Sequence, residues 1–261
     1  MISLPSERKA LLFSSGGVRL ALRLSQVREI IEVPAGGGEV VARGESVPSA
    51  YVSTVLGLPG GPARYALITE ATPRTALRVE ALHGIIDLTS AEAFQLPAHT
   101  LLPQPSPYAG ALVTKGEVAL ELAVSSLGFA PIEPAMDSGE PPPSLGPWME
   151  RELRFARGGL TFGVPMSILM QVVEAPRLAP VPLTPRSHRG LLVYGRALHA
   201  VVDVAMLYDQ AASEQVVGRV LLIDAGGAGV GVVADRVLGV GEGTADAEVL
   251  RPPWDAVFAA G

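Results

Sequence analysis

The side chains with the most obvious chemical potential are the histidines and a set of late aspartates. Three aspartates, Asp203, Asp224 and Asp235, could form a carboxylate cluster or a phospho-acceptor site, but the two lysines of the chain are too few and badly placed to complete one. The four histidines show no metal-ligand spacing, and no cysteine is present to join them. We therefore expect no metal site, no cofactor, and structural, capping or surface roles for these residues. The histidines are His83, His99, His188 and His199.

A glycine-rich stretch, Gly226–Gly231, has the composition of a dinucleotide-binding loop. It is followed by a strand-like run, VVADRV, and not by a helix whose N-terminus could hold a pyrophosphate. A hairpin turn is the better interpretation. The chain also lacks the motifs typical of hydrolases, zinc peptidases and phosphate-binding loops. A hydrolase or isomerase using Asp and His would need converging titratable groups, which the sequence does not offer, so we predict a protein that is not an enzyme.

Two arginines at predicted turns are the polar residues best suited to recognition. Arginine carries a rigid fork of five donors that fits carboxylates and backbone carbonyls at interfaces. Arg43 is followed by Gly44 and, after three more residues, by Pro48, whereas Arg196 follows a glycine. The alternative for both arginines is a plain surface charge at a turn.

The composition limits the class of partner and the class of fold. The net charge of −6 argues against a nucleic acid or an anionic membrane surface as partner, because both attract a basic face. The 29 glycines and 23 prolines divide the chain into short segments, which favours strands and turns over long helices. No apolar run is long enough to span a membrane, and we see no signal peptide at the N-terminus. We expect a cytoplasmic protein without direct membrane insertion.

The sequence contains an internal duplication. Residues 158–176 align without a gap to residues 16–34, an offset of 142, and residues 219–240 align to residues 64–85, an offset of 155. A repeat of this length indicates two copies of a whole domain. Within residues 16–34, the segment Leu24–Glu32 has its apolar residues at the spacing of a short helix or an irregular turn.

A proline-rich stretch separates the two copies. Residues 131–147 hold six prolines among acidic and small residues, a composition that favours an extended linker over a packed core. We place a first domain at residues 8–129, the linker at 130–148 and a second domain at 149–261.

The order and spacing of these segments resemble the CheW-like family of chemotaxis scaffolds. The resemblance rests on GLTFGVPMSILMQVVEAP, then APVPLTPRSHRGLLVYGRALHAVVDV, then GRVLLIDAGGAGVGVVADRVLGV in the second copy, and more weakly on residues 8–129. It implies a mainly β fold in which each domain has two small five-stranded SH3-like β-barrel subdomains. It also implies a non-enzymatic adaptor that binds a CheA-type histidine kinase, methyl-accepting chemoreceptors or another CheW-like protein.

Both copies depart from the family pattern. The resemblance implies that protein-binding residues are Arg43, Gly44, Pro48, Arg196 and Asp203, but Arg-Gly is inverted to Gly195-Arg196, and Tyr51 replaces the motif aspartate in the first copy. A one-residue slip in a strand reverses the side-chain face, so we expect Arg196 to present a different surface from Arg43.

The second copy also ends before a counterpart of the last hairpin of the first copy, residues 111–129. An unpaired strand edge invites another chain, so we expect a contact near the C-terminus with a partner or another domain, unless the second barrel is simply open. The decayed motifs leave an alternative function: a repurposed module serving another signalling or motility system without array contacts.

Overall fold

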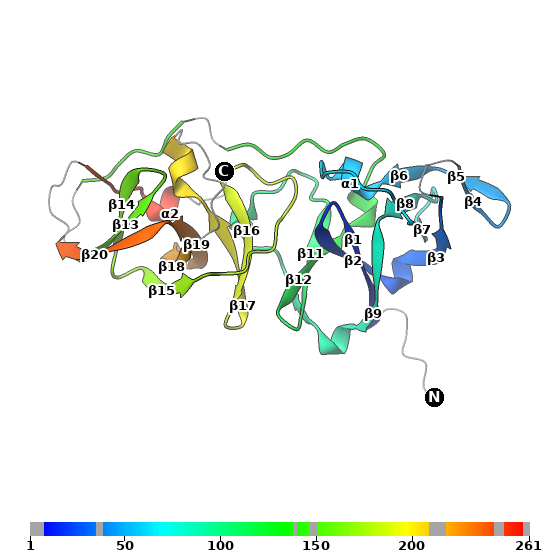
Figure 1. Ribbon diagram of the computed structural model, residues 1–261, viewed down its shortest axis with the longest axis horizontal. Coiled ribbons are helices and arrows are strands. Elements are labelled where there is room, and N and C mark those ends of the chain that lie inside the picture. Colours follow the sequence, from blue (N-terminus) through cyan, green and yellow to red (C-terminus); the bar gives the residue numbers. More distant parts are fainter. Residues whose placement is uncertain are drawn as a thin grey trace. The chain divides into compact units, whose positions relative to one another are not determined.

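The computed structural model describes residues 8–34, 39–137, 140–146, 151–208, 218–242 and 248–257. These residues form short strands with only single-turn helices, so the predicted mainly β fold is confirmed (Figure 1). They divide into two compact units. Unit 1 takes in the described residues of Met1–Leu96, Leu102–Pro134 and Val181–Leu183, and unit 2 those of Pro97–Leu101, Ala135–Pro180 and Thr184–Gly261.

The predicted linker divides between the units after Pro134. The assignment of Pro97–Leu101 to unit 2 and of Val181–Leu183 to unit 1 was not foreseen from the sequence. The domain limits at 8–129, 130–148 and 149–261 stay predictions.

The first sheet of unit 1 has six strands in the order β10-β11-β12-β2-β1-β9. The predicted hairpins are confirmed, since β1 turns into β2 with Ser15 opposite Val18, and β11 turns into β12 with Thr114 opposite Glu117. Strand β12 then pairs with β2 in parallel, which joins the two hairpins into one sheet. The strands are β1 (Lys9–Ser15), β2 (Val18–Arg23), β9 (Ala81–Asp87), β10 (Glu92–Phe94), β11 (Tyr108–Thr114) and β12 (Glu117–Leu122).

The second sheet of unit 1 has the order β3-β7-β8-β6, beside a separate β4-β5 hairpin. Pro48 lies between β5 and β6; because proline has no N–H to donate to a ladder, it divides what is one strand in unit 2. The elements are β3 (Val27–Glu32), β4 (Val40–Ala42), β5 (Glu45–Val47), β6 (Ser49–Tyr51), α1 (Val52–Val55), β7 (Tyr65–Thr69) and β8 (Ala76–Val79).

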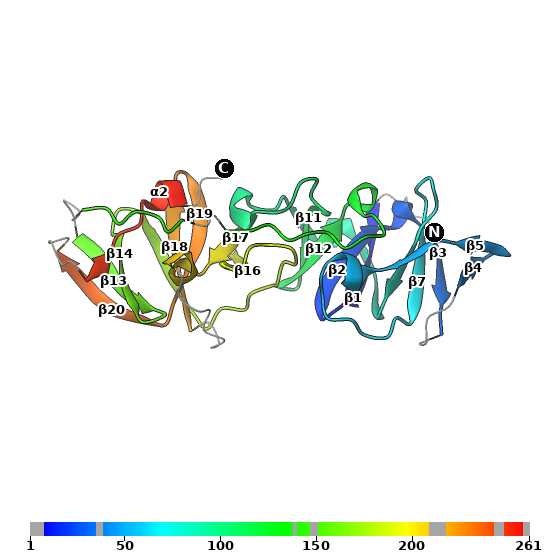
Figure 2. The same cartoon turned by 90° about the horizontal axis from the view of Figure 1, so that it is seen from above.

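Unit 2 repeats this plan with sheets in the orders β20-β13-β14-β21 and β15-β18-β19-β17-β16. The hairpin strands β13 and β14 and the strands β16 to β20 are labelled in Figure 2. Its core is aromatic: Phe155 stacks on Phe162 with ring centroids 5.4 Å apart, and Trp254 packs beside them. The elements are β13 (Arg151–Arg157), β14 (Leu160–Pro165), β15 (Leu169–Glu174), β16 (His188–Tyr194), β17 (Ala197–Val202), β18 (Arg219–Ala225), β19 (Ala228–Ala234), β20 (Arg236–Glu242), β21 (Val249–Leu250) and α2 (Trp254–Val257).

The end of unit 2 requires one correction to the expected loss of the last hairpin. Strand β21 pairs in parallel with β14, placing Leu250 opposite Phe162. In unit 1, Leu120 of β12 lies opposite Leu20 of β2, and Leu20 is the residue that aligns with Phe162. A two-residue strand therefore occupies the place of β12. The described residues of unit 2 contain no counterpart of β10 or β11, and unit 2 is the shorter of the two.

Two segment interpretations are also settled. The helix alternative for Leu24–Glu32 is wrong: a 3₁₀ turn at Leu24–Gln26 leads into strand β3. The β-branched Val27, Ile30 and Ile31 suit a strand, and the antiparallel ladder with β7 decides the conformation. The glycine-rich stretch is the predicted hairpin, because Gly226 and Gly227 form the turn between β18 and β19 with φ of 67° and 90°.

Candidate protein-interaction site

Two of the predicted binding residues lie in the exposed β4-β5 turn of unit 1. Ala42 pairs with Glu45, which leaves Arg43 and Gly44 as the two loop residues, with φ of 53° and 83°. Two left-handed residues in a two-residue loop define a type I′ turn, whose twist matches the flanking strands. Glycine adopts this conformation freely, but arginine does so at a steric cost. The turn carries the Arg43 side chain, 68% exposed, beyond the sheet.

A groove of about 240 Å³ lies beside this turn. Its apolar floor includes Ile68 and Val47, both buried. Charged residues from two strands, β3 and β5, and from the β4-β5 and β7-β8 loops form its rim. The groove is lined by Arg28, Glu29, Ala42, Arg43, Glu45, Val47, Ile68 and Arg74.

The rim charges are held in surface ion pairs. Arg43 Nε lies 3.2 Å from Glu29 Oε2, and Arg74 Nη1 lies 3.3 Å from Glu45 Oε2. Such exposed pairs contribute only about 0–1 kcal/mol each, so a partner carboxylate can replace the internal one at little cost. The groove is therefore suited to an extended segment that carries both apolar and acidic side chains.

Pro48 is exposed and leads into β6. Its carbonyl accepts a hydrogen bond of 2.8 Å from the backbone N–H of Ala76, which fixes the start of β6 against β8. The neighbouring Val47 lines the groove and Pro48 does not. Pro48 therefore affects the groove indirectly, by fixing the backbone next to Val47.

The matching turn of unit 2 joins β16 to β17. Tyr194 pairs with Ala197, so Gly195 and Arg196 are the loop residues, and Gly195 has φ of 62°. Arg196 is exposed and holds the second loop position, the one that Gly44 holds in unit 1. The inverted order thus places the two arginines at different corners of equivalent turns. Whether they present different surfaces to a partner stays a prediction.

Asp203 differs from the other predicted binding residues because it is buried, with 1% exposed. Arg157 Nε donates to Asp203 Oδ1 at 2.9 Å, and Arg157 Nη2 donates to Asp203 Oδ2. Arg157 also donates to Asp235. The hydrogen bonds that Arg157 donates to Asp203 outweigh the effect of burial and raise the pKa of Arg157. A partner reaches the Asp203 carboxylate only if this ion pair opens, which favours a positioning role.

Sequence reasoning missed Arg157 and the other buried arginines, Arg78 and Arg251. The only available signal was that Arg157 aligns with Ser15, so one copy places a charge where the other has a small residue. A strand arginine next to an apolar run is otherwise indistinguishable from a surface residue.

Asp224 and Asp235 also accept hydrogen bonds from turn N–H groups, the capping role predicted for them, and Asp235 does so in addition to its pair with Arg157. Asp224 Oδ1 accepts from the Gly227 N–H at 2.7 Å, and Asp235 Oδ2 accepts from the Gly158 N–H at 3.0 Å. The described residues contain no group of three or more side chains able to hold a metal ion.

Two of the histidines are structural. His199 Nδ1 lies 3.0 Å from the Gly229 carbonyl, and His188 Nδ1 accepts from the Gly190 N–H at 3.2 Å. Burial lowers the pKa of His188 to about 4, so its ring is neutral at neutral pH.

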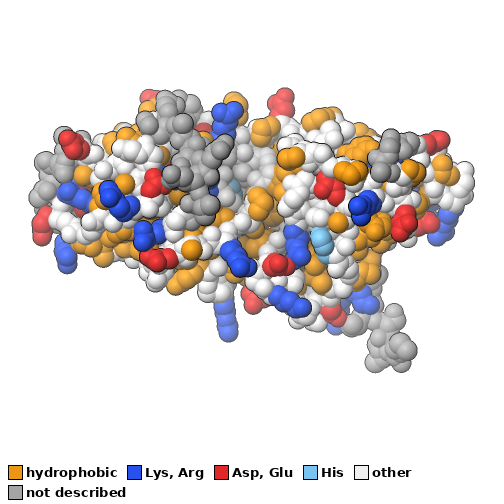
Figure 3. Space-filling view, viewed as in Figure 1, with side chains coloured by type: hydrophobic (Ala, Val, Ile, Leu, Met, Phe, Trp, Pro, Cys, Tyr) orange, Lys and Arg blue, Asp and Glu red, His pale blue; other side chains and the backbone are white. Residues whose placement is uncertain are grey.

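The surface carries charges of both signs. On the face drawn in Figure 3, the basic and acidic side chains are interspersed with apolar ones and do not gather into a field of one sign. Across the described parts of the chain, the helices are all too short to cross a membrane.

A pair of duplicated, mainly β units that presents an arginine-lined groove on a hairpin has the features of a protein-binding module. The chain belongs to the CheW-like domain family, whose model matches residues 9–128 and again 152–249. The predicted tandem of CheW-like domains is thereby confirmed.

Among solved structures, the chain is similar to the scaffolding protein TtCheW from Thermoanaerobacter tengcongensis, with 18% identity and a TM-score of 0.36. That match covers 45% of this chain and 89% of TtCheW. A search among curated proteins found no match.

Proposed function

We propose that this protein is a non-enzymatic adaptor of the cytoplasm that couples methyl-accepting chemoreceptors to a CheA-type histidine kinase. The observation that carries the proposal is the occurrence of two CheW-like matches in one chain. Family membership supports a scaffolding role, and the groove beside Arg43 offers a surface for it.

Bivalent docking is the mechanism that two units support. A chain with two weak binding surfaces turns the second binding event into an intramolecular one, at an effective concentration on the order of millimolar for a short linker. Such a chain bridges receptor and kinase, or two kinases, without a single tight interface. Within unit 1, Arg43 would exchange its pair with Glu29 for a carboxylate of the partner.

The test is a binding titration of the full chain against the regulatory domain of a CheA-type kinase and against the tip of a chemoreceptor. Arg43→Glu is expected to weaken one of these interactions about tenfold. Arg19→Glu is the matched control, because Arg19 also forms an exposed ion pair in unit 1, with Glu117, but lies outside the groove. If neither partner binds the wild-type chain, the adaptor proposal fails; if both bind and Arg43→Glu changes nothing, the groove is the wrong surface.

A second candidate is a repurposed CheW-like module that serves another signalling or motility system. The inverted Gly195-Arg196 turn and the burial of Asp203 favour it, because the first moves the exposed arginine to the other loop position and the second takes the aspartate out of reach of a partner. In the same titration this candidate predicts no binding to kinase or receptor, together with binding to another CheW-like protein.

A further inference from the structure

At the outer edge of β21, the described residues of unit 2 show no counterpart of a strand that unit 1 has. In unit 1, β12 lies between β2 and β11, and Glu121 pairs with Gly110 of β11. In unit 2, β21 occupies the position of β12 against β14, and no described strand pairs with its other side. By this register, Arg251 corresponds to Glu121, so its backbone groups face the open edge.

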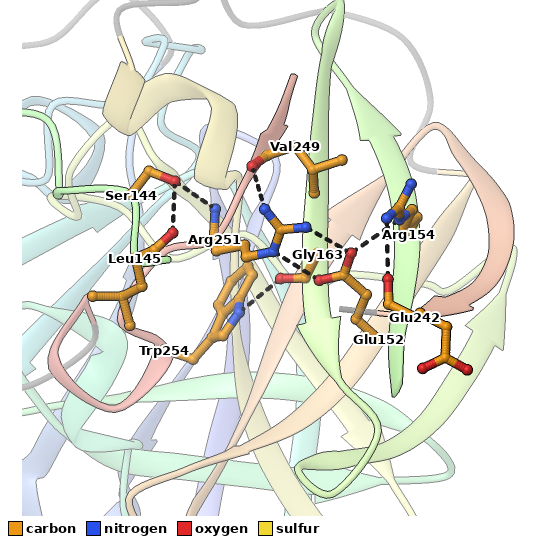
Figure 4. Close-up of polar contacts among 9 residues, drawn as sticks. All are labelled: Ser144, Leu145, Glu152, Arg154, Gly163, Glu242, Val249, Arg251 and Trp254. Carbon is orange, nitrogen blue, oxygen red and sulfur yellow. Dashed lines mark hydrogen bonds and ion pairs between the residues drawn. The ribbon is translucent and has the colours of Figure 1, made fainter. Parts of the chain in front are cut away.

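Two residues of the proline-rich linker occupy this edge. The Leu145 N–H donates to the Arg251 carbonyl at 2.8 Å, and the Arg251 N–H donates to Ser144 Oγ at 3.0 Å (Figure 4). Ser144 and Leu145 thus supply the hydrogen bonds at Arg251 that Gly110 would supply in a complete sheet. Both linker residues are exposed, so little apolar burial holds them in place.

The edge itself is fixed independently of the linker. The Arg251 guanidinium donates two hydrogen bonds to Glu152, at 2.9 Å and 3.0 Å, and a third to the Val249 carbonyl at 3.2 Å. Trp254 Nε1 donates to the Gly163 carbonyl at 3.0 Å and anchors the chain that follows. The linker can therefore leave while β21 and Arg251 remain in place.

We propose that this edge is a strand-docking site, and that an extended apolar strand of a partner protein adds to β21 by displacing Ser144 and Leu145. The chemistry of the partner strand follows from unit 1, where β11 fills the same position with a mostly apolar sequence, YAGALVT, in antiparallel orientation. Strand addition draws its affinity from main-chain hydrogen bonds and its specificity from alternate side chains. The linker competes for the same bonds and lowers the apparent affinity for the partner.

The probe is a labelled peptide with the sequence of residues 107–115 of this chain, PYAGALVTK, titrated against the full-length protein by fluorescence anisotropy. Leu145→Pro removes the N–H that bonds to Arg251 and leaves the sequences of the strands of unit 2 unchanged; prolines already occur at 141–143 of the same stretch. It is expected to tighten peptide binding about two- to tenfold, the amount that one backbone hydrogen bond contributes. Leu145→Ala keeps the N–H and is expected to match the wild type. Hydrogen exchange is expected to show new protection at residues 249–251 when the peptide binds.

Three outcomes overturn the proposal: no peptide binding by either form, equal binding by wild type and Leu145→Pro, or protection that appears away from residues 249–251. Concentration-dependent dimerisation of Leu145→Pro without peptide also overturns it, because the occupant would then be a second copy. An unchanged thermal unfolding midpoint of Leu145→Pro shows that unit 2 is intact. The experiment uses no kinase or receptor, so its result is separate from that of the adaptor test.

Discussion

The last strands of the two units are fastened by ion pairs of opposite polarity. In unit 1, Arg23 on β2 pairs with Glu121 on β12, with Arg23 Nη2 3.0 Å from Glu121 Oε2. In unit 2, Glu152 on β13 pairs with Arg251 directly after β21. The positions match, because Arg23 lies across from Ala10 in the β1-β2 ladder and Ala10 aligns with Glu152. The duplication has kept the attachment of the parallel strand and exchanged the charges that make it.

The two ion pairs differ in how deeply they are buried. The side chains of Arg23 and Glu121 are 35% and 10% exposed, whereas those of Glu152 and Arg251 are 0% and 3% exposed. In unit 1 the last strand also pairs with β11, but β21 has no such neighbour among the described residues. A short strand without a ladder on its outer side depends more on its ion pair, and desolvation makes that pair harder to break on one side only.

The largest expected effect comes from Arg251→Ala. It leaves the buried Glu152 carboxylate with Arg154 as its remaining cationic partner among the described residues, and breaking a buried pair on one side costs about 3–5 kcal/mol of unfolding free energy. Urea unfolding followed by Trp254 fluorescence measures unit 2 selectively, in a Trp148→Phe background that leaves one tryptophan.

The matched variant in unit 1 is Arg23→Ala, for which we expect a loss of about 1 kcal/mol, since its pair is partly solvated. Hydrogen exchange of β12 reports on this variant. Equal losses in the two units would contradict the dependence on burial.

The second contrast concerns how each unit keeps an arginine inside the fold. Arg157 of unit 2 is paired with Asp203, whereas Arg78 of unit 1 lies over the ring of Tyr51, 5.3 Å from its centroid, and donates to Ser49 Oγ at 3.0 Å. Tyr51 stands at the position that Asp203 holds in unit 2. A cation–π contact has thus taken the place of a charge pair.

Asp203→Asn sharpens this contrast. It removes the charge that compensates Arg157 but leaves Asp235, 34% exposed, as a partner, so we expect a loss of about 3 kcal/mol in unit 2, at the lower end for a buried pair. Tyr51→Leu in unit 1 is expected to cost about 1–2 kcal/mol in cation–π energy. If Asp203→Asn lowers the unfolding free energy by less than about 1 kcal/mol, the ion pair is not structural. Asp203 would then again be a candidate binding residue.

The sequence allowed the duplication, the hairpins and the β class to be predicted because these depend on local patterns. Turn glycines and alternating apolar residues marked β1-β2, β11-β12 and β18-β19. The replacement of β12 by Val249–Leu250 was not predictable in this way, because two residues carry no periodicity and their parallel partner is about 90 residues distant in the chain.

The candidate site was predictable only in part. The Arg43-Gly44 turn follows from turn chemistry, but the groove beside it depends on tertiary placement of Arg28, Ile68 and Arg74. The family motif alone marked Asp203 as a contact residue, and nothing in one sequence revealed that Arg157, 46 residues earlier, occupies its carboxylate. Long-range ion pairs leave no local signature.

Lowering the pH is expected to destabilise unit 2 through His188. Its pKa is about 4 in the folded state against 6.5 when unfolded, so the unfolded chain binds the proton first. The stability that depends on a neutral His188 is fully present above pH 6.5 and is lost as the pH falls from 6.5 toward 4. At pH 5 the loss of unfolding free energy is about 2 kcal/mol. The other titratable side chains that line the cavity beside His188 are His99 and Asp137. Urea unfolding at pH 7 and pH 5 measures the loss, and His188→Gln is expected to remove most of it; an unchanged pH dependence in this variant would assign the effect to other groups.

The smallest expected effect on stability belongs to Arg43→Ala, and it separates binding from folding most cleanly. The side chain is 68% exposed and its pair with Glu29 is solvated, so the unfolding free energy is expected to change by less than about 0.5 kcal/mol. Replacing an arginine in a left-handed turn position with alanine keeps the same backbone strain, so the loop conformation is expected to persist. If unit 1 loses its partner while its hydrogen exchange is unchanged, Arg43 acts at an interface. If stability falls by more than 1 kcal/mol instead, the residue holds the β4-β5 hairpin in place, and the exposed turn of unit 1 is as structural as the buried Asp203 pair of unit 2.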